Sequence, residues 1–103
     1  MIIQYTTFQT LFPNVNITET DFNTIEPFAE SFAKLYTQKS LPSTNDVKFA
    51  IGLIIQQIVA IGLRAKDLAN YSIAGETSGQ PQFTDVIPEL AKSILDNYKE
   101  IVL

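Results

Sequence analysis

The chain has 103 residues and a formal net charge of −4, from seven basic and eleven acidic side chains, and it contains neither His nor Cys. The missing residue types exclude disulfides, thiol nucleophiles, His-based acid–base catalysis and His/Cys metal sites. A protein that binds DNA through its phosphates needs clustered Lys and Arg residues. The basic residues of this chain are scattered, so sequence-specific DNA binding is not expected. The length and the 46% hydrophobic content predict one globular domain over residues 1–103.

The first predicted element is a short helical turn over residues 6–12. Thr6 is placed to cap it, Gln9 lies three residues further on as a capping box requires, and Pro13 is expected to stop it. Its apolar residues fall on one side and are expected to pack into the core: Phe8, Leu11 and Phe12.

A second helix is predicted near residues 19–38. Thr18 is a suitable N-cap, and two early acids, Glu19 and Asp21, suit a helix N-terminus. Apolar residues recur at steps of three and four and form one stripe: Phe22, Ile25, Ala29, Phe32 and Tyr36. Pro27 lies inside this pattern and predicts a kink or a late helix start, because proline lacks an amide donor and crowds the preceding turn.

The third helix, predicted near residues 45–70, has the sharpest pattern and is expected to be the centre of the domain. Its apolar residues alternate steps of four and three along one seam: Val47, Ile51, Ile54, Ile58, Ile61, Ala65 and Leu68. Phe49, Leu53 and Leu63 lie on its other faces, and any that stay uncovered would form an assembly surface. Gly52 and Gly62 are unfavourable inside a helix, and close helix–helix approach is one reason to tolerate them.

A long loop, from Tyr71 to about Phe83, precedes a last helix predicted near residues 85–101. Loops of more than about 12 residues are uncommon in compact domains and are often functional. The last helix has an apolar stripe of its own: Ile87, Leu90, Ala91, Ile94, Tyr98 and Ile101. The sequence therefore predicts an all-α fold, a small bundle of three main helices plus a short N-terminal helical turn.

No catalytic, cofactor-binding or metal-binding residues are predicted. Two acidic pairs have helical spacing, Glu26 with Glu30 and Asp96 with Glu100, but no third acidic residue is expected to converge on either pair, so both are expected on solvated faces. The most apolar run, Phe49–Leu63, spans 15 residues and is interrupted by two glutamines, whereas a helix that crosses a bilayer needs roughly 20 apolar residues. A buried helix is therefore favoured over a membrane segment, and residues 1–5 lack the features of a signal peptide.

Read from end to end, the chain resembles the head–tail connector (head-completion adaptor) family of tailed bacteriophages. The resemblance lies in the order of the parts. An early Leu11-Phe12-Pro13 precedes a helix with Phe22 and Ala29, and a longer central helix ends in Gly62-Leu63-Arg64-Ala65. A loop, Ser72-Ile73-Ala74-Gly75-Glu76-Thr77-Ser78, then leads to a helix that ends in a Leu95-x-x-Tyr98 pattern.

The resemblance implies a structural virion protein with no enzymatic activity and no cofactor. Several copies would form a ring beneath the portal protein, extend the DNA channel without binding DNA specifically, and dock a neighbouring connector or tail protein. Its place would be the head–tail junction of the virion, and the host cytoplasm before assembly. Two other classes stay open: a small membrane-active protein that uses the Phe49–Leu63 helix, and a helical regulator that binds a partner protein.

The contact elements expected for ring assembly are the 71–83 loop and the C-terminal helix, whose last residues are apolar at a chain end. The exposed side of the central helix is the alternative surface. The candidate interface residues are Tyr71, Ser72, Ile73, Gly75, Glu76, Ser78, Phe49, Leu53, Ile101, Val102 and Leu103.

Overall fold

A computed structural model describes residues 1–62, 68 and 83–99 of the chain. Its α-helices are α1 (Tyr5–Leu11), α2 (Glu19–Thr37), α3 (Asn45–Ala60) and α5 (Glu89–Leu95), and its 3-10 helices are η1 (Phe83–Val86) and η2 (Asp96–Tyr98). All of these elements are helical, and the described residues contain no strand. The predicted all-α fold is confirmed.

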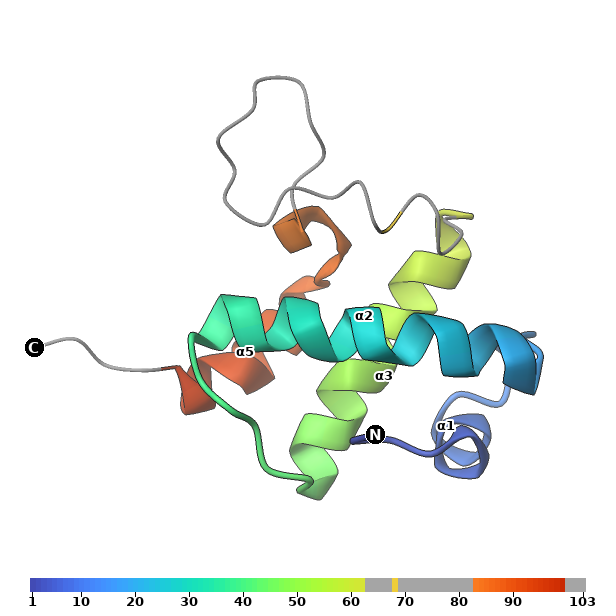
Figure 1. Cartoon of the computed structure of the whole chain (residues 1–103), viewed down its shortest axis with the longest axis horizontal. Coiled ribbons are helices and arrows are strands. Elements are labelled where there is room, and N and C mark those ends of the chain that lie inside the picture. Colours follow the sequence, from blue (N-terminus) through green and yellow to red (C-terminus); the bar gives the residue numbers. More distant parts are fainter. Residues whose placement is uncertain (63–67, 69–82, 100–103) are drawn as a thin grey trace, which may run out of the picture.

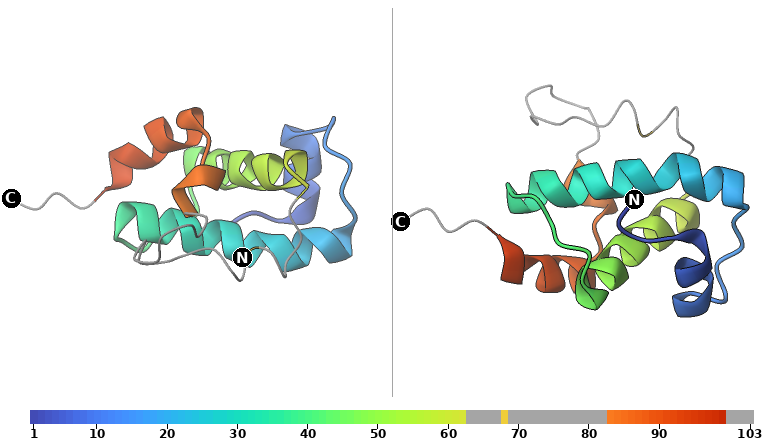
Figure 2. Two further views of the ribbon diagram at one scale, coloured as in Figure 1. Left: turned by 90° about the horizontal axis from the view of Figure 1, so that it is seen from above. Right: turned by 60° about the horizontal axis from the view of Figure 1, so that its bottom comes forward.

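The helices form two layers, and α3 belongs to one of them. Figure 1 shows α2 crossing in front of α3, and the view from above in Figure 2 places α2 on one side with α1, α3 and α5 on the other. Helix α3 contacts α1, α2, α5 and η1. The prediction that the third helix is the centre of the domain is therefore confirmed.

The apolar seam of α3 is buried as far as Ile58, but the helix is shorter than predicted. Four seam residues are fully buried: Val47, Ile51, Ile54 and Ile58. Helix α3 ends at Ala60 because Gly62 adopts φ 75° and its N–H bonds to the carbonyl oxygen of Val59 (3.1 Å). Ile61 is consequently 48% exposed, so the prediction of one continuous helix over 45–70 is wrong.

The other glycine of this helix, Gly52, makes room for an aromatic ring. A Cβ atom at Gly52 would overlap the ring of Phe12, which follows α1. That ring is stacked between Phe8 and Phe49, at centroid distances of 5.1 and 5.3 Å. Gly52 therefore makes room for a side chain and not for the close helix–helix approach that was predicted, whereas Gly62 ends the helix.

Helix α2 follows the predicted pattern closely. Thr18 caps it, because its side-chain oxygen accepts a hydrogen bond from the backbone N–H of Asp21 (3.1 Å). The first four residues of the predicted stripe are buried: Phe22, Ile25, Ala29 and Phe32. Pro27 lies exposed within a helix that already begins at Glu19, so it does not mark a late start.

Two helix starts differ from prediction. Helix α1 begins at Tyr5 after Gln4, which makes no side-chain cap, so Thr6 is not the N-cap, and Leu11 is 41% exposed. The last helix is broken, because η1 ends at Val86 and α5 starts only after Pro88. Within α5, Ala91 of the predicted stripe is buried together with Leu95, while Leu90 of the same stripe is 56% exposed.

Candidate functional site

Most of the predicted interface lies outside the described residues. This holds for Tyr71, Ser72, Ile73, Gly75, Glu76, Ser78, Ile101, Val102 and Leu103. Of the two candidates on α3, Leu53 is buried, and Phe49 is half-buried and stacked on Phe12. The apolar side chains at these two positions are therefore largely covered by other residues of the same chain.

The most unusual polar arrangement is a carboxyl pair on α2, formed by Glu26 and Glu30. Glu26 is fully buried, and its Oε2 accepts hydrogen bonds from the backbone N–H groups of Ile2 (3.1 Å) and Ile3 (3.3 Å). The N–H of Ile2 also donates to Oε2 of Glu30 (2.9 Å). The prediction that this pair lies on a solvated face is wrong, because the N-terminal segment covers it.

The two carboxyls of this pair differ in protonation. Burial, followed by the hydrogen bond with Glu30, raises the pKa of Glu26 to about 8. Burial acts on Glu30 in the same direction. The hydrogen bond with Glu26, the amide of Ile2 and nearby positive charges outweigh it and lower the pKa of Glu30. Near neutral pH the pair therefore holds one proton and one negative charge.

The sequence carried a signal for this burial. Glu26 lies four residues after Phe22 and three before Ala29, which places it on the apolar face of α2. An acid on that face must find hydrogen-bond donors within the fold, since burying a charge or a polar group without partners is costly. The donors are backbone amides more than 20 residues away in the sequence, and no local pattern identifies them.

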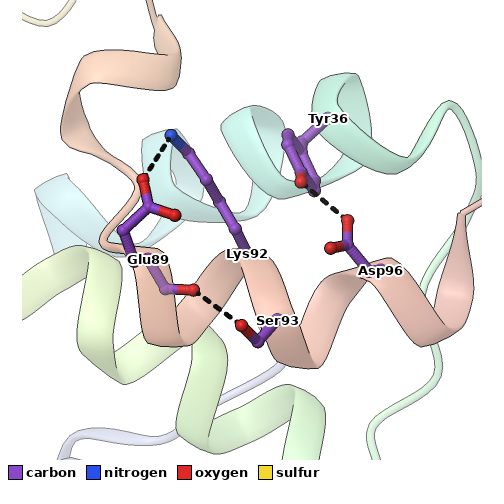
Figure 3. Close-up of polar contacts among 5 residues, drawn as sticks. All are labelled: Tyr36, Glu89, Lys92, Ser93 and Asp96. Atoms are coloured by element: carbon purple, nitrogen blue, oxygen red, sulfur yellow. Dashed lines mark hydrogen bonds and ion pairs between the residues drawn. The ribbon is translucent and has the colours of Figure 1, made fainter.

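A second polar cluster lies at the C-terminal end of α2 and is exposed. The hydroxyl of Tyr36 donates to Oδ1 of Asp96 (2.7 Å), as Figure 3 shows. The Nζ of Lys99 lies 3.8 Å from the same oxygen and 4.4 Å from the centre of the Tyr36 ring. The hydrogen bond to Asp96, with a smaller contribution from burial, raises the pKa of Tyr36 to about 12.

A matching contact ties the end of this region to the start of α3. The hydroxyl of Tyr98 donates to Oδ2 of Asp46 (2.6 Å), and Thr44 also donates to this carboxylate. The hydrogen bonds from Thr44 and Tyr98 lower the pKa of Asp46. Tyr36 and Tyr98 thus hold α5 and η2 against α2 and α3.

Helix α5 has two further polar contacts on its exposed side. Lys92 pairs with Glu89 (3.4 Å), and the hydroxyl of Ser93 donates to the carbonyl oxygen of Glu89 (3.1 Å), as Figure 3 shows. Each lies within one turn of the helix, so these contacts support the helix itself.

The carboxylates at both places bind groups of this chain: backbone amides bind to Glu26 and Glu30, and tyrosine hydroxyls bind to Asp96 and Asp46. Among the described residues, no group of three or more acidic side chains is arranged to hold a metal ion. Comparison of the chain with protein-family models, with curated proteins and with solved structures finds no match. The arguments for function therefore rest on the chain itself.

Proposed function

We propose that the protein is a structural component of a phage virion, a head–tail connector that assembles as a ring beneath the portal protein. The observation that supports this best is the order of helical parts around α3. A short N-terminal helix, a capped second helix, a central helix and a last helix follow one another in the order on which the resemblance rests, although α3, with 16 residues, is shorter than the 19-residue α2. The proposal includes no enzymatic activity and no cofactor.

The charge of the chain is compatible with this role. A net charge of −4 discourages DNA phosphates from sticking, so DNA can pass through a ring of such subunits without being held. The proposed partners are the portal protein and a neighbouring connector or tail protein. The proposed location is the head–tail junction, and the host cytoplasm before assembly.

The alternative of a membrane-active protein gains no support from α3. Three of its most apolar side chains, Ile51, Ile54 and Ile55, are fully buried in the domain core, and each would have to leave it to meet lipid. Within the described part of the chain, no helix has the length and apolar content needed to span a bilayer. No structural observation favours the helical regulator over the connector.

Assembly on a portal tests the proposal. The purified chain is mixed with the candidate portal protein and imaged by negative-stain electron microscopy, and rings on the portal are expected. Deleting Ile101–Leu103, or shortening Glu76–Gln80, is expected to reduce ring assembly while circular dichroism keeps its helical signal. A chain that does not bind the portal protein, and that light scattering shows to be monomeric at high concentration, would contradict the proposal and favour the regulator.

A matched variant separates the two candidate surfaces. Lys48→Glu reverses a charge beside Phe49 on α3 without removing a buried side chain, so it probes the α3 surface alone. If the loop and C-terminal regions make the contacts, Lys48→Glu assembles normally. If both shortened chains assemble normally and Lys48→Glu does not, the contact surface is the side of α3 around Phe49 and Leu53.

A further inference from the structure

The N-terminal segment, residues 1–4, is attached to the domain by an unusual combination of contacts. It lies beside α2, as the mark of the N-terminus in both views of Figure 2 shows, and it forms no helix or strand of its own. The side chains of Ile2 and Ile3 are buried in the core, and their backbone amides bond to Glu26 and Glu30. The described polar contacts of this segment with α2 thus converge on one carboxyl pair.

The ionisation of Glu26 and Glu30 depends on the hydrogen-bond donors and charges around the pair. Oε1 of Glu26 is buried and has no hydrogen-bond partner among the described residues, so an ionised Glu26 has unsatisfied acceptor capacity beside a second carboxylate. The positive charges that act on the pair are the amino group of Met1 and Lys34. Helix α1 has Tyr5 as its one titratable residue, and the charged residues of α3, Asp46 and Lys48, lie in its first turn.

We propose that Glu26 and Glu30 form a pH-operated clasp, which holds residues 1–4 against α2 and releases them as the pH rises without unfolding the helical domain. Release uncovers the apolar surface that Ile2 and Ile3 cover in the closed form. The clasp is independent of the proposed connector function.

The direction of the pH effect follows from proton linkage. In the closed form Glu26 keeps its proton up to a pKa of about 8, and in the released form it is solvated and titrates near its ordinary pKa of 4.5. Opening therefore gives up one proton between these two values. The opening equilibrium is expected to rise roughly tenfold per pH unit in this window and to level off above it.

Hydrogen exchange of backbone amides, followed by NMR, tests the clasp on the full chain between pH 5.5 and 8. Protection factors, which are corrected for the intrinsic pH dependence of exchange, are compared for Ile2, Ile3 and the core residue Ile54. At each pH the protection of Ile2 and Ile3 is expected to be at least about tenfold below that of Ile54, because local opening costs less than unfolding. It is also expected to fall roughly tenfold per pH unit.

Glu26→Gln is the matched variant, because its neutral amide keeps the shape of the protonated acid. It is expected to retain the protection of Ile2 and Ile3 with little pH dependence. The proposal is overturned if these amides exchange only together with Ile54, if their protection does not depend on pH, or if Glu26→Gln behaves like the parent.

A second measurement uses the parent protein alone, so it still tests the clasp if the Glu26→Gln variant does not fold. The carboxyl carbon resonance of Glu26 reports its ionisation directly in the parent protein. Titration of this resonance well above pH 4.5, in step with the loss of Ile2 protection, supports the clasp. Titration near 4.5, with the amides still protected, overturns it.

Discussion

Glu26 and Asp46 are both carboxylates that accept hydrogen bonds from this chain, yet the fold moves their pKa values in opposite directions. Glu26 is fully buried, and its pKa is raised despite two backbone amide donors. Asp46 is exposed to water, and two hydroxyl donors lower its pKa. The comparison shows that desolvation outweighs hydrogen bonding inside this small core, whereas hydrogen bonding prevails at its surface.

The same contrast separates two kinds of structural role. At the surface, Tyr36 and Tyr98 connect helices that apolar packing already holds together, so each contact is expected to contribute modestly. In the middle of α2, Glu26 and Glu30 make the described polar contacts with residues 1–4, and under the proposed clasp their protonation is linked to the position of that segment.

The largest effect is expected where a carboxylate enters the core without donors. Ile54→Asp or Ile58→Asp places an acid in the fully buried seam of α3, at a cost of several kcal/mol against a total stability of about 5–15 kcal/mol. Either variant is expected to be unfolded by circular dichroism. Gln56→Glu, on the exposed side of the same helix, is the control and is expected to melt within a few degrees of the parent. A parent-like melting curve for Ile54→Asp would show that the core tolerates a lone acid.

The next largest effect is the pH dependence of stability due to Glu26. Because the folded pKa of about 8 lies above the unfolded value near 4.5, its contribution is full below pH 4.5 and is lost as the pH rises toward 8. Glu26→Gln removes this loss. Urea denaturation is expected to show the variant gaining on the parent by about 1 kcal/mol per pH unit between pH 5 and 8. Parallel curves for the two proteins would mean that Glu26 is ionised in the fold throughout this range.

A smaller effect is expected when one methyl group is added at Gly52 or at Gly62. Gly52→Ala overlaps the Phe12 ring and is expected to cost about 1–3 kcal/mol, although alanine favours helix formation. Gly62→Ala meets no atom within 4 Å, so its cost of about 1 kcal/mol comes from the positive φ alone. Thermal denaturation of both variants separates a packing cost from a backbone cost. Equal or reversed losses would place the Phe12 ring elsewhere.

The smallest effect is expected at the exposed cluster. Tyr36→Phe removes the hydroxyl that donates to Asp96 and is expected to cost about 0.5 kcal/mol in chemical denaturation. The Tyr36 contribution is present below pH 10 and is lost as the pH rises toward its pKa of about 12. Ultraviolet titration is expected to show a late-ionising phenol that disappears in Tyr36→Phe and persists in the control Tyr98→Phe. An unchanged titration in Tyr36→Phe would exclude the Asp96 contact.

Local patterns predicted the helices well where burial and periodicity agree. The cap at Thr18 and the buried stripe of α2 follow from residue types at fixed spacings. The same reasoning failed at the end of α3, where the apolar seam continues through Ile61 but Gly62 takes a positive φ and stops the helix. It failed again in the last helix, where the helix is interrupted between Val86 and Glu89, and α5 buries Ala91 and Leu95 but leaves Leu90 exposed.

The sequence by itself determined the all-α class, the central position of the third helix and most of its buried seam, because helical periodicity is a local property of the chain. It also determined which chemistries are excluded, through the absence of His and Cys. Tertiary structure alone decided that Gly52 faces the Phe12 ring and that Glu26 and Glu30 receive the amides of Ile2 and Ile3. These contacts join segments 23 to 40 residues apart, and a pattern that repeats every three or four residues carries no information about such distant partners.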